Sequence, residues 1–154
     1  VIKSKNINLK LHMVGQLQTN KVKNVIPLFD YIHSLDSLKL AKKISSEQKK
    51  INRNLKIFIQ VNIGEEKQKG GMDSKEVNDF YKICSTELNL NIIGLMCIPP
   101  KECNLDTHFN LMKELNASLG LKELSMGMSS DYMDAIKYGS TYVRIGSRIF
   151  GSRD

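Results

Sequence analysis

Short apolar runs rich in β-branched residues alternate with longer polar segments along almost the whole chain. The apolar runs lie at residues 9–15, 30–35, 55–63, 90–98, 122–128 and 140–146. A strand interior that is apolar almost without a break, such as IFIQV (57–61), is typical of a parallel sheet covered by helices. The alternation therefore predicts repeated βα units and an α/β fold with a parallel sheet.

Three of the polar segments have the residue spacing of amphipathic helices. The stripes at helical spacing are Leu38, Ala41, Ile44 and Ser45 in segment 36–50, and Val77, Phe80, Tyr81, Cys84 and Leu88 in segment 74–88. Segment 109–120 ends at Gly120, a residue suited to a helix C-terminus. We expect helices over these three segments.

The chain has 154 residues, and no Gly/Ser linker or change of composition divides residues 1–154, which predicts a single domain. A closed (β/α)8 barrel needs eight strands and about 250 residues, so six predicted strands are too few for one. An open doubly wound sheet fits the length better, yet the sequence contains neither GxGxxG nor GxxxxGK[ST]. Composition alone leaves open both an open sheet and a barrel that lacks some of its units.

The net charge of +7 arises from 19 lysines and 4 arginines against 16 acidic residues. The lysines are scattered along the chain, and the sequence contains no zinc finger or aromatic-studded basic strand. We therefore expect solvated basic helix faces and no nucleic-acid partner. A basic nucleic-acid-associated protein is kept as an alternative.

No apolar stretch approaches the roughly 20 residues that span a bilayer, and the start, VIKSKNINLKLH, has no signal-peptide core. These features predict a cytoplasmic protein without a membrane partner. The three cysteines form no CxxC pair, which argues against a disulfide framework and a zinc site. No Ser/His/Asp, Cys/His or HExxH arrangement is readable, so we assign no metal ligand and no catalytic residue.

Two Ser/Gly-rich turns lie near the C-terminus, in LSMGMSSDYMDAI (124–136) and GSTYVRIGSRIFG (139–151), each directly after a predicted strand. The first turn puts Ser129 or Ser130 where a helix N-cap would lie, and the second contains Gly146 and Ser147. If the two strands are adjacent and parallel, backbone N–H groups and hydroxyls of both turns converge, as in (β/α)8 proteins that bind phosphate. The alternative is that the serines cap helices and the glycines end strands.

Arg144 lies between the apolar residues Val143 and Ile145 in the last predicted strand. Its side chain must point away from theirs, either to a barrel interior or to the helical layer, and burying a guanidinium without a partner is costly. Contact with a ligand and a salt bridge to a neighbouring carboxylate both fit this position.

Two further segments resemble loops at the ends of strands. HMVGQLQTNK (12–21) carries polar residues after a strand, and QVNIGEEKQKGGM (60–72) carries Asn62 and a charged loop. A single histidine in an apolar strand, such as His12, is more often a core residue than a ligand. Glu65 and Glu66 are not assigned as an acid/base pair, because adjacency alone does not indicate one.

Taken together, these segments resemble the pyridoxal-phosphate homeostasis protein family, single-domain relatives of the alanine racemase N-terminal barrel. The family has G-x-L-Q-[ST]-N-K, Q-[VI]-N-x-x-x-E-x-x-K-x-G and G-L-M-x-I segments, similar here to GQLQTNK, QVNIGEEKQKGG and GLMCI, followed by LSMGMSSDYMDAI and GSTYVRIGSRIFG. The resemblance covers the chain from about Leu11 to its end. It implies a (β/α)8 TIM-barrel type of fold.

The resemblance also implies a cofactor, pyridoxal 5′-phosphate (PLP), and residues that bind it. The phosphate matches Ser129 in the first turn and Gly146 with Ser147 in the second, and Arg144 matches the arginine that faces the pyridine nitrogen. Met96 and His12 are expected to line the barrel interior. The family implies a carrier that serves intracellular PLP homeostasis rather than an enzyme, with PLP-dependent apo-enzymes as its potential protein partners.

The chain also departs from the family pattern. Family members begin with a helix and two strands, the first of which carries the Schiff-base lysine, and residues 1–10 match the helix and loop before the third strand. Lys3, Lys5 and Lys10 are therefore not equivalents of that lysine, and we expect six of the eight βα units, with the first two absent by truncation. Such a half-barrel exposes strand edges and part of its core, which predicts poor solubility or association.

The sequence is also compatible with two alternatives to a PLP carrier. One is a fragment of a PLP-dependent amino-acid racemase or decarboxylase of the same barrel superfamily, although those enzymes add a β-rich C-terminal domain. The other is a remnant without function.

Overall fold

The computed structural model describes residues 9–66, 70–100 and 104–151. Its centre is one sheet of six parallel strands in the order β1 to β6, so that each strand pairs with its neighbour in sequence. The strands are β1 (His12–Met13), β2 (Tyr31–Leu35), β3 (Lys56–Val61), β4 (Asn91–Cys97), β5 (Glu123–Met128) and β6 (Tyr142–Arg144). All six predicted runs therefore contain strands, and the predicted α/β class is confirmed.

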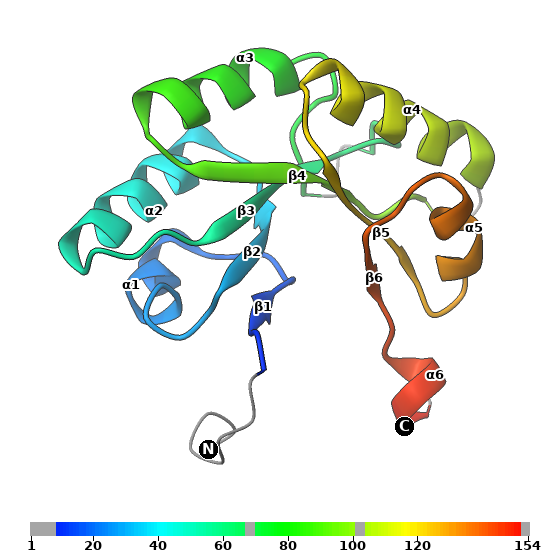
Figure 1. The fold of residues 1–154 in the computed structure, drawn as a ribbon, viewed down its shortest axis with the longest axis horizontal. Helices are drawn as coiled ribbons and strands as arrows, with labels where there is room; N and C mark the ends of the chain where they lie inside the picture. Colours follow the sequence, from blue (N-terminus) through cyan, green and yellow to red (C-terminus); the bar gives the residue numbers. More distant parts are fainter. Residues whose placement is uncertain (1–8, 67–69, 101–103, 152–154) are drawn as a thin grey trace.

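Helical segments connect successive strands, and one more follows β6. They are η2 (Thr19–Lys21), α1 (Val22–Val25), α2 (Leu38–Lys50), α3 (Val77–Lys82) with a continuing π-helical turn η3 (Ile83–Glu87), α4 (Leu105–Ser118), α5 (Tyr132–Lys137) and α6 (Ser147–Phe150). The larger helices cover the outer side of a curled sheet, and the first and last strands lie toward the open side (Figure 1). This curled half-barrel is consistent with a TIM-barrel type of fold.

The ends of several elements differ from the predictions. The first strand was expected over 9–15 but pairs only at β1, and the last was expected over 140–146 but forms only β6, because each is an edge strand with one neighbour. The helix expected over 109–120 corresponds to α4, which begins earlier, at Leu105. Its N-cap is Asn104, whose side chain accepts a hydrogen bond from the backbone N–H of Thr107. It ends before Gly120, whose positive φ of 66° fits the predicted helix end.

The side chains of each inner strand alternate between two environments. In β3, Ile57, Ile59 and Val61 belong to the apolar core between sheet and helices, whereas Phe58 contacts rings on the concave side. The core-facing stripe predicted for 74–88 is confirmed, since its members are buried or pack against the core. On α2 the prediction for Leu38 is wrong: this side chain is 37% exposed, and Leu40 is buried instead.

Five aromatic rings lie on the concave side of the sheet: His12, Tyr31, His33, Phe58 and Tyr142. They come from β1, β2, β3 and β6. The rings of His12 and Tyr142 lie 5.8 Å apart between centroids, so side chains of the two edge strands meet across the open side. His12 therefore faces the interior, as predicted, and Met96 is buried outside the helix-facing core.

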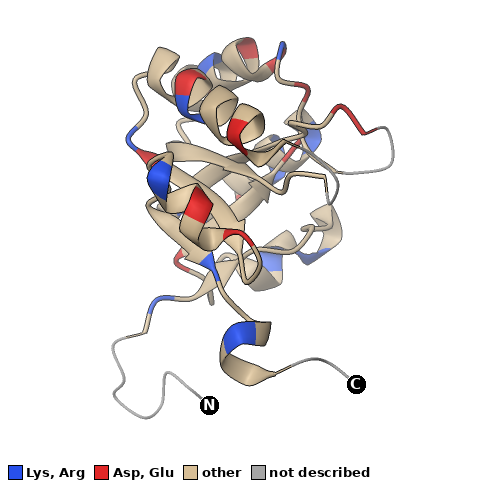
Figure 2. Ribbon diagram, turned by 90° about the vertical axis from the view of Figure 1, so that its right-hand side faces the viewer, with Lys and Arg blue, Asp and Glu red and all other residues tan. Residues whose placement is uncertain are grey.

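Acidic residues lie among the basic ones on the helices in the view of Figure 2. On α2, for example, Glu47 accepts hydrogen bonds from Lys43 and Lys50 at 2.7 and 2.8 Å. Within the described part of the chain, no helix has the length and apolar character required to cross a membrane. The same residues contain no cluster of potential metal ligands. Cys84 is a buried free thiol, and Cys97 is also buried. Cys103 lies outside the described residues.

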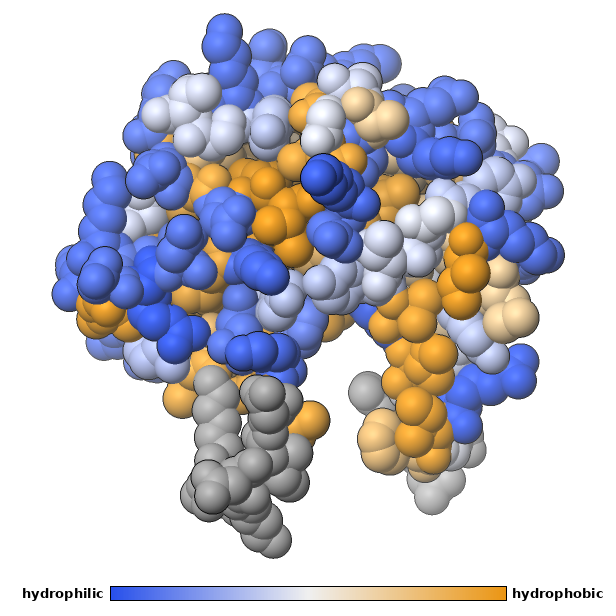
Figure 3. All heavy atoms as spheres, in the orientation of Figure 1, coloured by the Kyte–Doolittle hydropathy of each residue, from blue (hydrophilic) through white to orange (hydrophobic). Residues whose placement is uncertain are grey.

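Apolar side chains are exposed on the last βα unit, where orange atoms follow β6 and α6 in Figure 3. Val143 is 37%, Ile149 66% and Phe150 85% exposed. These side chains support the expectation that the chain associates, which stays a prediction. The resemblance matches residues 1–10 to the helix and loop before the family's third strand. Residues 1–8 of this segment lie outside the described residues.

Candidate functional site

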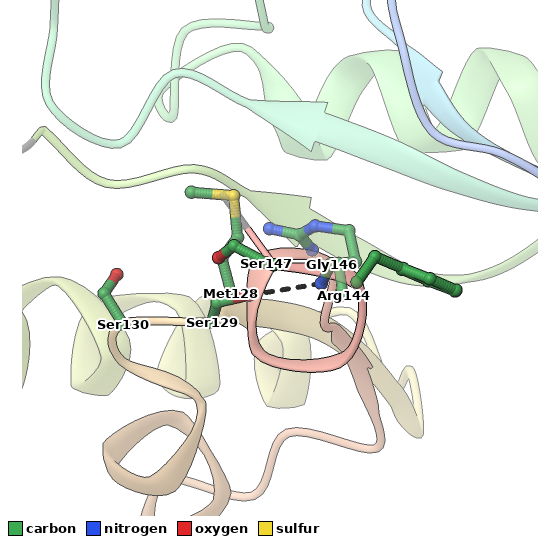
Figure 4. Close-up of a pocket in the computed structure, with 8 residues that line it drawn as sticks. Met128, Ser129, Ser130, Arg144, Gly146 and Ser147 are labelled. Carbon is green, nitrogen blue, oxygen red and sulfur yellow. Dashed lines mark hydrogen bonds between the residues drawn. The ribbon is translucent and has the colours of Figure 1, made fainter. Parts of the chain in front are cut away.

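The two Ser/Gly-rich turns lie side by side at the C-terminal ends of β5 and β6. Met128 pairs with Arg144 in the sheet, so both strands end at the same edge. The Ser129 hydroxyl accepts a hydrogen bond from the backbone N–H of Gly146 at 3.1 Å (Figure 4). It also accepts one from the backbone N–H of Arg148 at 3.5 Å. The predicted convergence of the two turns is confirmed.

The serines of the first turn do not cap their own helix. The N-cap of α5 is Asp131, whose carboxylate accepts a hydrogen bond from the backbone of Met128 at 2.6 Å, so the expectation of Ser129 or Ser130 at this position is wrong. The Asp131 carboxylate makes no capping hydrogen bond to α5 and bonds back into the preceding turn instead, while the Ser129 hydroxyl binds the first turn of α6. One hydroxyl thus joins two loops that are 17 residues apart.

A cavity of about 580 Å³ opens at this edge of the sheet. Its lining includes Met128, Ser129, Ser130, Arg144, Gly146 and Ser147. The volume lies within the range of about 300–1,000 Å³ that is typical of small-molecule sites. The backbone N–H groups of Ser130 and Ser147 have no hydrogen-bond partner among the described residues. The cavity therefore offers donors to an anion, and it brings all four predicted site residues together.

Arg144 points into the interior of the half-barrel rather than into the helical layer. One terminal nitrogen donates to the Ser125 hydroxyl at 2.8 Å, and the other donates to the backbone carbonyl of Cys97 at 2.8 Å. The third nitrogen, Nε, is buried and has no partner in the described structure. Burial lowers the pKa of Arg144, while Cys97 and Asp131 act in the opposite direction.

The salt bridge to a carboxylate that the sequence left open is not found for Arg144 among the described residues. An N–H group that is buried without a partner is costly, and such a group at a cavity is the natural place for an acceptor from a ligand. Arg144 also lines a second cavity of about 500 Å³, which includes His12, His33 and Tyr142. The guanidinium therefore lies between the turn at the sheet edge and the aromatic interior.

The hydrogen bonds continue beyond Arg144 to Ser125 and His33, which the sequence did not single out, and from there to His12. Ser125 Oγ lies 2.9 Å from His33 Nδ1, and His33 Nε2 lies 2.9 Å from His12 Nδ1. Burial, followed by the effects of His12 and Arg144, lowers the pKa of His33 from 6.5 to about 3. Burial also lowers the pKa of His12, and Asp30 partly opposes this shift.

A signal for these residues was present in the sequence. Ser125 and His33 are polar residues inside otherwise apolar strands, which is unusual unless each has a partner. Both residues are buried, with 0% and 2% of their surface exposed. What a single strand does not reveal is the partner, because the bond between them joins residues 92 positions apart.

In the loop after β3, the side chain of Asn62 has a structural role, since it holds the backbone of the loop. The side-chain amide of Asn62 donates to the carbonyl of Glu66 at 2.9 Å, and its oxygen accepts from the backbone N–H of Glu66 at 3.2 Å. Residues 67–69 of this loop lie outside the described residues. The described residues of segment 60–72 add no side chain to the cavity at β5 and β6.

A curled sheet of parallel βα units, with a donor-lined cavity at the C-terminal ends of its last two strands, defines a barrel-type ligand-binding domain. The chain belongs to the alanine racemase N-terminal domain family, which it matches over residues 1–154.

Within this family, the chain is similar to proteins named pyridoxal phosphate homeostasis protein. It is 38% identical over 158 residues to the one from Aquifex aeolicus, and the alignment covers 97% of this chain and 69% of that protein. The resemblance stated from the sequence is thereby confirmed.

Solved structures give the same assignment. PipY of Synechococcus elongatus matches with a TM-score of 0.90 without PLP and 0.89 with PLP bound, at 32% and 31% identity. These matches cover 96% of this chain and 74% and 73% of the PipY chains. An alanine racemase from Clostridium difficile matches with a TM-score of 0.73 over 99% of this chain and 42% of its own, but at 16% identity this likeness concerns the fold alone.

Proposed function

We propose that this chain binds pyridoxal 5′-phosphate between the ends of β5 and β6 and acts in the homeostasis of this cofactor. The observation that carries the proposal is the buried Nε of Arg144, which has no partner among the described residues and lies beside a cavity with open backbone donors. Support comes from the names of the relatives and from PipY, which was solved with PLP bound.

The residues of the cavity fit the two ends of this cofactor. Ser129, Gly146 and Ser147 are proposed to hold the phosphate, since two neighbouring turns supply the hydroxyls of Ser129 and Ser147 and the open N–H of Ser147, and Gly146 lines the cavity beside them. Arg144 is proposed to donate a hydrogen bond to the pyridine nitrogen through Nε.

Bound PLP supplies an electron sink for carbanion chemistry. A guanidinium has donors only and keeps its proton, so it holds the ring nitrogen unprotonated and weakens that sink. This arrangement favours holding the cofactor over catalysis, and we assign no catalytic residue. PLP-dependent apo-enzymes are the proposed protein partners, and the cytoplasm is the proposed location.

We further propose that residues 1–154 form one domain that corresponds to six of the eight βα units of a TIM-type barrel. The sheet has six strands with an open side, and the matched relatives are longer than the matched region. A fragment of a racemase or decarboxylase is supported only by likeness of fold.

Replacement of Ser129 by alanine is expected to weaken PLP binding by roughly 5- to 20-fold, because the two turns lose the hydroxyl that joins them. Equilibrium dialysis of the purified chain with PLP, with and without inorganic phosphate as a competitor, measures this change. Ser118→Ala on α4 is the matched control, since its hydroxyl contacts only the Leu115 carbonyl in the described structure. Absence of PLP binding, or binding that phosphate does not compete, would contradict the proposed function.

A further inference from the structure

A buried chain of hydrogen bonds crosses the concave side of the half-barrel from β6 to β1. It runs from Arg144 to Ser125, from Ser125 to His33 and from His33 to His12, over distances of 2.8, 2.9 and 2.9 Å. Four strands contribute to it, namely β6, β5, β2 and β1. No helix of the outer layer takes part, so the chain belongs to the interior that Arg144 faces.

The chemistry of the donors gives this chain one direction. Arg144 can only donate, so the Ser125 oxygen is an acceptor. If His33 Nδ1 also donated to Ser125, the serine proton would be left buried without a partner, because Ser125 is 0% exposed. Ser125 therefore donates to an unprotonated Nδ1 of His33.

The same reasoning fixes both histidines. Neutral His33 carries its proton on Nε2 and donates it to Nδ1 of His12, which must then be an acceptor. His12 consequently carries its own proton on Nε2. A second proton on His33 would break the bond from Ser125, so the chain requires both imidazoles to be neutral.

The surroundings hold the two rings in place and disfavour a second proton. His33 stacks on Phe58 with 4.3 Å between centroids, and His12 stacks on Tyr31 at 4.0 Å. The titratable or charged groups that face His33 are His12, Tyr31, Tyr142 and Arg144. Asp30 acts on His12. Within the described structure, no carboxylate contacts His33, and the low pKa of this residue agrees with a neutral ring.

The geometry points to Ser125 and His33 as positioning residues that fix the guanidinium of Arg144 and thereby set the direction of its Nε–H, the nitrogen that has no partner in the described structure. The Cys97 carbonyl and Ser125 each accept one N–H of a terminal nitrogen, and His33 sets the direction in which the serine proton points. The acceptor that fits is an unprotonated nitrogen of an aromatic heterocycle. Its identity as the pyridine nitrogen of PLP rests on the proposed function, whereas the hydrogen-bond chain does not.

Nitrogen NMR of the imidazoles, recorded without ligand, tests the chain itself. The expected result is that His33 has an unprotonated Nδ1 and a protonated Nε2 from about pH 8 to about pH 5, and that His12 has the same tautomer at about pH 8. The exposed His108, which belongs to no such chain, is the reference within the same spectrum. A proton on His33 Nδ1, or a charged His33 at about pH 5 to 6, would overturn the inference.

Variants test the effect on Arg144. Ser125→Ala is expected to broaden the Arg144 Nε–H signal and to reduce by about tenfold the preference for PLP over an analogue with CH in place of the ring nitrogen. Ser125→Thr, which retains the hydroxyl, should restore both. Ser34→Ala is the matched control, because Ser34 is a serine in β2 whose buried hydroxyl has no partner in the described structure.

The two proposals fail in different ways. A wild-type chain that shows the expected tautomers but does not bind PLP would overturn the proposed function and leave the hydrogen-bond chain in place. A wild-type chain that prefers PLP over the analogue, with the same preference and the same Nε–H signal in Ser125→Ala, would overturn the role of Ser125 and His33.

Discussion

Substitution of Gly94 by alanine is expected to lower the free energy of unfolding by roughly 3 kcal/mol or more, which is a large part of the stability of a single domain. Gly94 pairs with Glu123 where β4 lies beside β5. A Cβ atom at this position would overlap the carbonyl oxygen of Glu123 and lie 2.6 Å from its carbonyl carbon. The obstacle is backbone, which cannot rotate away as a side chain could.

Movement of β5 would be needed to accommodate the methyl group. That strand places Leu124 and Met126 in the core and Ser125 in the interior hydrogen-bond chain. A shift would therefore disturb both faces of the sheet as well as the turn that contains Ser129.

Urea denaturation followed by circular dichroism measures the loss of stability caused by Gly94→Ala. Gly15→Ala is the control, because no atom lies within 4 Å of a Cβ built at Gly15 and its φ is not in the left-handed region. A midpoint for Gly94→Ala equal to that of the wild type would show that β4 and β5 are not packed in the register described.

Replacement of Arg144 by glutamine is expected to weaken PLP binding by about 10- to 150-fold, the effect of losing a hydrogen bond from a charged donor. Glutamine is shorter and neutral, so it cannot reach Ser125, the Cys97 carbonyl and the ligand together. The affinity for inorganic phosphate is expected to change less, because Ser129, Gly146 and Ser147 hold that group in the proposal. The variant therefore separates recognition of the ring from recognition of the phosphate.

The measurement is a pair of dissociation constants, one for PLP and one for inorganic phosphate, for each protein. Arg53→Gln is a matched control, since Arg53 also donates to a backbone carbonyl, that of Phe29, but does not line the cavity. An equal loss of PLP affinity in the two variants would show that Arg144 acts through the fold and not on the ring.

The order and approximate positions of the six strands could be predicted from the sequence because each strand is a compact apolar run. Helix-facing residues such as Ile57 and Ile59 and an interior residue such as Phe58 are all apolar, however, so the pattern does not reveal the side of the sheet to which each points. The curl of the sheet, which brings His12 to Tyr142, depends on contacts between distant strands. For the same reason the sequence left an open sheet and a partial barrel as alternatives.

The candidate site was predictable where its residues follow strand ends. Ser129, Gly146 and Ser147 lie on two successive βα turns, and parallel strands bring such turns to one edge. The partners of Arg144 were not predictable, because Ser125 and the Cys97 carbonyl are 19 and 47 residues away. The carboxylate considered as an alternative partner was a reasonable expectation for a buried arginine, but the interior supplies neutral acceptors instead.

The location of bound PLP is the most direct test of the account, and a map of NMR chemical shifts on addition of PLP measures it. The account predicts that the changes concentrate at the N–H groups of Ser129, Gly146 and Ser147 and at Nε–H of Arg144. A competing anion site is available beside α2, where Lys39, Lys42 and Lys43 line a cavity of about 470 Å³. Changes confined to those lysines, or no changes at all, would contradict the assignment of the cofactor site to the ends of β5 and β6.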